Sequence, residues 1–232
     1  MLSDTRTNAG LDHISTFKKM KVWTMPKNRT IALLSAGNLA VTQAVIGVLD
    51  KQIETPDGDP QGNILGATSM FDVARVVGNA VREVREIDGA SLSMGGLGFQ
   101  ASFLLAGQIA GKEQRLFTVY SEGNFVEATM DTPFMQIGET RHGQPVMDLL
   151  MHFNVPLTDA IKICLISMES SLKSNMSVGL PLDLLVCKRD QPGKYLQRRI
   201  NEFDKDYQSI RDSWSYALQR AYEGMADLDL DL

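Results

Sequence analysis

Residues 19–36 read KMKVWTMPKNRTIALLSA. Two apolar segments, KMKVWT at 19–24 and TIALLSA at 30–36, flank the turn-forming residues PKNR. Pro and Asn at such a place favour a tight reversal of the chain, so this stretch predicts a β-hairpin. Asn38, a residue type that caps helices, follows directly and predicts a helix from there to about Ile53.

The elements expected after this hairpin and helix form blocks of strands and helices rather than a strict alternation of the two. ETPDGDPQGN at 54–63 and GGLG at 95–98 are expected as a loop and a turn. Apolar spacing predicts helices at about 69–87, 143–153, 156–174 and 203–224, and strands at 99–105, 116–120, 125–128, 133–139 and 181–189. This order favours an α+β fold in which sheets pack face to face under helices.

The length and the charge limit the function further. The chain has 232 residues, 44% of them hydrophobic, which is enough for one sizeable core. We expect a single domain over residues 1–224 and an acidic, loose tail over residues 225–232. The net charge of −5 and the dispersed basic residues argue against nucleic acid as a partner. No apolar run reaches the roughly eighteen residues of a membrane span, so we expect no membrane partner and no export.

The cysteines and histidines predict no metal site and no disulfide. Cys164 and Cys187 lie in apolar stretches, which indicates buried, reduced thiols and a cytoplasmic location. The histidines, His13, His142 and His152, have no ligand-like spacing. No glycine-rich phosphate loop is visible, so no cofactor or nucleotide is expected.

Six motifs in a fixed order carry a resemblance to a known family. They are SDTRTNAG at 3–10, STFKKM at 15–20, LLSAGNLA at 33–40, FQASFLLAGQI at 99–109, MQIGETRHGQP at 135–145 and SNMSVGLPLDLL at 174–185. In this order the chain resembles proteasome β-type subunits, most closely the bacterial branch called Anbu. The resemblance implies a four-layer αββα sandwich of two stacked antiparallel sheets, the fold of N-terminal-nucleophile hydrolases. It also implies a self-compartmentalised homo-oligomer that hydrolyses peptide or protein substrates with an N-terminal threonine.

The resemblance also assigns three site residues. Lys19 matches the family's lysine, whose charge lowers the pKa of the threonine α-amino group that acts as general base. Asp4 matches the aspartate that orients this lysine, and Gly37 matches the glycine whose N–H faces the developing oxyanion. Arg6 matches a supporting basic position. Taken singly, Asp4 is more often a turn carboxylate, Lys19 part of a solvated cluster and Gly37 a corner before a helix cap; their order together favours the catalytic interpretation.

The chain departs from the family pattern at two places. Gly138-Glu139 stands where proteasome subunits carry a serine after a glycine, and Asn175 and Ser177 stand where an aspartate and a serine are often found. The register around Asn175 and Ser177 is open by one residue, so no role is assigned to these positions.

The family's threonine and first strand are expected roughly fifteen residues before Ser3, which is about one strand and a turn. Thr5, Thr7 and Thr16 are internal to the matched motifs and cannot replace this threonine. Either Met1 is an internal methionine of a longer product, which we favour, or the chain is a short, non-catalytic subunit. The functional hypotheses are therefore a threonine-type peptidase subunit without activity as written, a scaffolding subunit of a proteasome-like assembly, or an unrelated ligand-binding α+β domain.

Overall fold

The computed structural model describes residues 1–8, 14–55, 62–95 and 98–226. Five antiparallel strands make the larger sheet in the order β4-β5-β6-β7-β8: β4 (Met20–Met25), β5 (Arg29–Gly37), β6 (Ala101–Ile109), β7 (Arg115–Val119) and β8 (Phe125–Glu127). Three antiparallel strands make a second sheet in the order β1-β9-β10: β1 (Leu2–Ser3), β9 (Leu182–Val186) and β10 (Leu196–Ile200). A hairpin of β2 (Arg6–Asn8) and β3 (Ile14–Thr16) stands apart from both.

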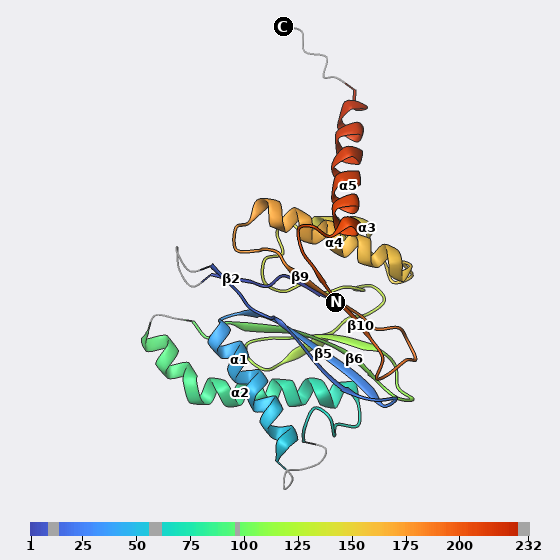
Figure 1. Ribbon diagram of the computed structural model, residues 1–232. Coiled ribbons are helices and arrows are strands. Elements are labelled where there is room, and N and C mark those ends of the chain that lie inside the picture. Colours follow the sequence, from blue (N-terminus) through green and yellow to red (C-terminus); the bar gives the residue numbers. More distant parts are fainter. Residues whose placement is uncertain (9–13, 56–61, 96–97, 227–232) are drawn as a thin grey trace.

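Three hydrophobic clusters separate four layers (Figure 1). The first cluster lies between the five-stranded sheet and the helices α1 (Leu39–Glu54) and α2 (Met70–Met94). The second lies between the two sheets. The third lies between the three-stranded sheet, α4 (Leu157–Ser174) and the first turns of α5 (Lys205–Glu223), while α3 (Gln144–Leu150) packs beside α4. The predicted αββα class is confirmed.

Strand β5 shows why the sequence builds these layers. Successive side chains of a strand point to opposite faces. Ile31 and Leu33 therefore enter the helix-side cluster, whereas Ala32 and Leu34 enter the cluster between the sheets. The continuous apolar run IALL at 31–34 reflects a strand that is buried on both faces.

Most predicted elements are confirmed. The hairpin of β4 and β5 forms with register Met25↔Arg29, and the Asn38 side chain caps α1 by accepting from the backbone N–H groups of Ala40 and Val41. The meander β6-β7-β8 and the helices α3, α4 and α5 occupy the expected stretches. Residues 56–61 of the predicted loop and 96–97 of the predicted turn lie outside the described residues.

Two expectations on helices and strands are wrong. Helix α2 does not end at about Ile87 but runs to Met94, with Ser93 Oγ donating to Gly89 O at 3.0 Å. Its last turns are mostly exposed, so no apolar periodicity marks them. Residues 133–139 form no strand. Met135 and Ile137 are apolar because they pack against the cluster between the sheets, not because they belong to a strand.

Strand β10 was not expected because its sequence, LQRRI, is polar. It pairs with β9, and Arg199 donates to both carboxylate oxygens of the buried Asp183 at 2.8 and 2.9 Å. This ion pair helps to fix β10 against β9, although the sequence of β10 has few apolar residues.

Candidate active site

Asp4 lies directly after β1, and its carboxylate accepts hydrogen bonds from three donors. Lys19 Nζ donates to Oδ1 at 2.6 Å, and the backbone N–H groups of Arg6 and Gly179 donate to Oδ2 at 3.1 and 3.2 Å. The side chains of Asp4 and Lys19 are 12% and 20% exposed, so the ion pair is largely shielded from solvent. The predicted partnership of Asp4 with Lys19 is present in the structure.

The Gly37 N–H lies on the edge of β5 that faces Lys19 and β4. Ser35 N donates to Lys19 O at 3.0 Å, which extends the pairing of β5 with β4 by one residue. On the opposite edge, Asn38 N donates to Gln100 O at 2.7 Å. Because hydrogen-bonded pairs alternate along an antiparallel ladder, the Gly37 N–H points away from β6 and toward the Lys19 side of β5.

The backbone at Gly37 requires a glycine. Its φ is +108°, in a region that other residues rarely adopt. A Cβ at this position would lie 2.3 Å from Gln100 O. Gly37 is exposed at the end of its strand.

The two departures from the family pattern meet next to this site. A Cβ on Gly138 would lie 3.3 Å from the Cβ of Ala36, which places residue 138 against the end of β5. Asn175 Nδ2 donates to Glu139 Oε2 at 2.7 Å, and Ser177 N donates to Asn175 Oδ1 at 2.8 Å. Glu139 is therefore held by the segment that follows α4.

Arg6 closes the cluster from β2. Its Nη1 donates to Met176 O at 2.9 Å. Gly179 leaves room for the guanidinium, because a Cβ there would lie 2.1 Å from Arg6 Nε. The sequence reasoning missed Gly179; its place in SNMSVGLP, between a helix and an apolar strand, was the signal that could have indicated a close approach of the backbone.

The hydroxyl groups of Thr5 and Thr7 donate hydrogen bonds to backbone carbonyls. Thr5 is fully buried, and its hydroxyl donates to Pro181 O at 2.7 Å. The Thr7 hydroxyl donates to Ser15 O at 3.0 Å. The Met1 ammonium, at the far end of β1, donates to Leu185 O at 2.8 Å, and burial lowers its pKa.

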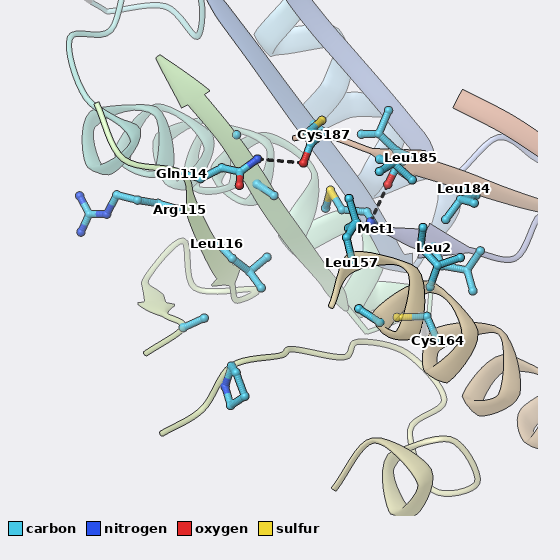
Figure 2. A pocket seen from close by; sticks show the side chains of 18 of the residues that line it. Met1, Leu2, Gln114, Arg115, Leu116, Leu157, Cys164, Leu184, Leu185 and Cys187 are labelled. Atoms are coloured by element: carbon cyan, nitrogen blue, oxygen red, sulfur yellow. Dashed lines mark hydrogen bonds between the residues drawn. The ribbon is translucent and has the colours of Figure 1, made fainter. Parts of the chain in front are cut away.

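A cavity of about 360 Å³ opens at the Met1 end of β1, between the two sheets and α4 (Figure 2). Its walls are mainly apolar and include Met1, Leu2, Leu116, Leu157, Leu184 and Leu185. Asp4, Lys19 and Gly37 are not among its lining residues. The cavity and the polar cluster are thus separate features of the structure.

Both cysteines line this cavity as free thiols. They are partly rather than fully buried, which corrects the expectation of buried thiols. Burial still raises the pKa of Cys164 and of Cys187. Gln114 Nε2 donates to Cys187 O at 3.2 Å at the edge of the cavity (Figure 2).

The described residues offer neither a metal site nor a membrane helix. They contain no cluster of three or more His, Cys, Asp or Glu side chains arranged to hold a metal ion. Within the same part of the chain, no helix has the length and apolar character needed to cross a membrane.

Comparisons with known proteins give one consistent result. No protein-family model matches the chain, and no curated protein matches it. Among solved structures, Anbu from Hyphomicrobium sp. strain MC1 has a TM-score of 0.91 and 41% identity, covering 99% of this chain and 94% of that one. Anbu, the ancestral β-subunit, from Yersinia bercovieri has a TM-score of 0.91 and 40% identity over the same shares of the two chains.

A third structure, described as the helical assembly of the Anbu complex from Pseudomonas aeruginosa, has a TM-score of 0.92 and 40% identity, covering 98% of this chain and 92% of that one. Identity at this level over nearly the whole length goes well beyond a shared fold. The chain therefore belongs to the Anbu family, the ancestral β-subunit branch of the proteasome-type N-terminal-nucleophile hydrolases.

Proposed function

We propose that this chain is a subunit of a proteasome-like homo-oligomer, and that Asp4, Lys19 and Gly37 are the supporting part of a threonine-type peptidase site. The observation that carries the proposal is the shielded ion pair of Asp4 and Lys19 on the same edge of β5 as the Gly37 N–H. The substrates are peptides or proteins, and the location is the cytoplasm. Residues 1–224 form one domain, with residues 225–232 as its tail.

Each of the three residues has a physical role in this chemistry. A threonine hydroxyl attacks a peptide carbonyl once a base has taken its proton, and the α-amino group of an N-terminal threonine is such a base. The Lys19 ammonium, held by Asp4 at 2.6 Å, would lower the pKa of that amine through like-charge repulsion. The Gly37 N–H donates to the oxyanion of the tetrahedral intermediate. The amine then returns its proton to the leaving nitrogen of the peptide bond.

Thr5 and Thr7, the threonines nearest to Asp4 in the sequence, do not supply the nucleophile. The hydroxyl of Thr5 is buried against Pro181 O, and that of Thr7 is bonded to Ser15.

A scaffolding subunit that assembles but does not cleave is the second candidate function. The Glu139–Asn175 hydrogen bond favours it, because a carboxylate held there replaces the hydroxyl that is expected from the family pattern. In that case Asp4 and Lys19 stabilise the fold and nothing more.

The test is the intact mass and N-terminal sequence of the protein purified from its native host, together with labelling by an epoxyketone. A native chain that begins with threonine and takes the label supports the peptidase, and Lys19→Met should then abolish labelling. Lys162→Met is the matched control, because Lys162 forms an exposed ion pair with Asp159 and should not affect labelling. A native chain that begins at Met1 or Leu2, assembles and stays unlabelled supports the scaffold and overturns the peptidase.

A further inference from the structure

Helix α5 leaves the body of the protein soon after it begins (Figure 1). Its nineteen residues span about 28 Å. Only the first turns pack on the body, where Tyr207 is buried and Ile210 contacts the cluster under α4. Beyond a hydrogen bond from Lys173 Nζ to Ser215 Oγ at 3.3 Å, every residue from 215 to 226 is exposed.

The apolar face of α5 does not end where the body ends. Residues at spacings of three and four share one face of a helix. They continue the buried face outward as a stripe that consists of Tyr207, Ile210, Trp214, Ala217, Leu218, Ala221 and Tyr222. In its outer half, the side chain of Leu218 is 50% exposed and that of Tyr222 is 75% exposed. The same face that packs on α4 is thus left uncovered over the outer turns.

The opposite face of α5 is polar. It carries Ser209, Asp212, Ser213, Arg220 and Glu223. The aromatic residue on this polar face is Tyr216, which is 66% exposed. An isolated helix of about three turns is marginal in water, because most helical stability in proteins comes from packing of the apolar face. The exposed stripe is therefore a surface that gains stability when a partner covers it.

We propose that the outer stripe of α5, formed by Trp214, Leu218 and Tyr222, docks on a second copy of this chain. The inference rests on the homo-oligomer of the proposed function and names the surface that builds it. The relative from Pseudomonas aeruginosa forms a helical assembly and aligns with 98% of this chain. The stripe itself is uncharged and apolar, which fits a protein surface and not a nucleic acid.

The contact is expected to be one part of a larger interface. Stable interfaces bury about 1,200–2,000 Å², whereas an aromatic side chain buries only about 150–250 Å². A protruding helix that seats on a different surface of the next copy makes a heterologous contact, which repeats from copy to copy into a ring or a helix. The stripe then links neighbouring copies while the rest of the interface lies on the body.

The test compares two substitutions on the two faces of the same helix. Leu218→Glu places a charge in the stripe, and Tyr216→Glu places the same charge about 200° around the axis on the polar face. Light scattering after size exclusion, over a series of concentrations, gives the midpoint of assembly for each variant and the wild type. We expect Leu218→Glu to raise this midpoint by about ten- to a hundredfold, and Tyr216→Glu by less than about threefold.

Each other outcome overturns a defined statement. If the wild type assembles and Leu218→Glu assembles equally well, the proposed homo-oligomer is supported but the role of the stripe is overturned. Equal loss in both variants overturns the assignment to one face. A monomeric wild type overturns the homo-oligomer and this inference together, and leaves the stripe to a different protein. Tyr222→Glu repeats the test at a more exposed position, and far-UV circular dichroism confirms that each variant is folded.

Discussion

Gly37→Ala is the substitution whose effect the structure determines most closely. Gly37 has φ of +108°, and a Cβ there would lie 2.3 Å from Gln100 O. Since real Cβ contacts are not shorter than about 3.0 Å, β5 and the end of β6 must separate by 0.7 Å. The same Gln100 O accepts the hydrogen bond from Asn38 N at 2.7 Å, so the separation also weakens the start of α1.

These two effects set the magnitude. A non-glycine residue in such a backbone conformation costs about 1–3 kcal/mol, and a weakened hydrogen bond adds about 0.5–1.5 kcal/mol. We expect Gly37→Ala to lower the free energy of unfolding by about 2–4 kcal/mol.

Urea denaturation followed by circular dichroism measures this free energy. Gly111→Ala is the control, because Gly111 also has a positive φ of +74° but no atom lies within 4 Å of the position that a methyl group would occupy there. It should cost only about 1 kcal/mol, the strain without the clash. If the two variants differ by less than about 0.5 kcal/mol, the close approach of Gln100 to Gly37 is not what requires the glycine.

Three further predictions concern ionisable groups. Asp4→Asn should lower the free energy of unfolding by about 1–3 kcal/mol, and a double-mutant cycle with Lys19→Met should show coupling above about 1 kcal/mol, since the pair is largely shielded from solvent. Burial, together with a hydrogen bond to a buried carboxylate, raises the pKa of Tyr207 above its ordinary value near 10. Its contribution to stability is therefore present below pH 10 and is lost as the pH rises above it, so wild type should lose stability between pH 9 and pH 11 faster than Tyr207→Phe in urea denaturation. Because burial raises the pKa of the Cys164 and Cys187 thiols, the folded protein should react with Ellman's reagent at pH 8 several-fold more slowly than the urea-unfolded chain.

Each of these predictions has a control and a contrary outcome. The exposed pair of Asp159 and Lys162 should show coupling of at most about 0.5 kcal/mol, and equal coupling in both pairs would contradict the shielding of Asp4. Parallel pH profiles for wild type and Tyr207→Phe would show that this hydroxyl does not titrate differently on unfolding. Equal rates of thiol reaction in folded and unfolded protein would show that the cavity does not protect the cysteines.

The elements that the sequence predicted are those marked by an apolar segment or by a capping residue. The apolar segment at 30–36 predicts a hairpin strand, which the structure confirms, and Asn38 caps the helix that follows. Strand β10 could not be predicted, because it is held by pairing with β9 and by the ion pair of Arg199 with Asp183, which lies sixteen residues earlier in the chain. The hydrophobicity pattern of one segment does not show which distant strand or charged residue that segment will contact.

The sequence indicates candidate residues for the site but not their geometry. The order of motifs indicated Asp4, Lys19 and Gly37, and the structure adds the 2.6 Å ion pair and the direction of the Gly37 N–H. The bond from the Gly179 N–H to Asp4 joins residues 175 positions apart, so a local pattern around Gly179 does not identify Asp4 as the partner. Whether the three residues act in catalysis stays a prediction.

The pairing of β1 with β9 also limits the order in which the chain can fold. Leu2 pairs with Leu184, so β1 has no strand partner in its sheet until about 180 further residues have been synthesised. At about 5–20 residues per second this takes on the order of 10–40 s. The five-stranded sheet, whose strands lie within residues 20–127, can assemble during that time. During translation β1 can therefore pair in its sheet only after β9, at residues 182–186, has been synthesised.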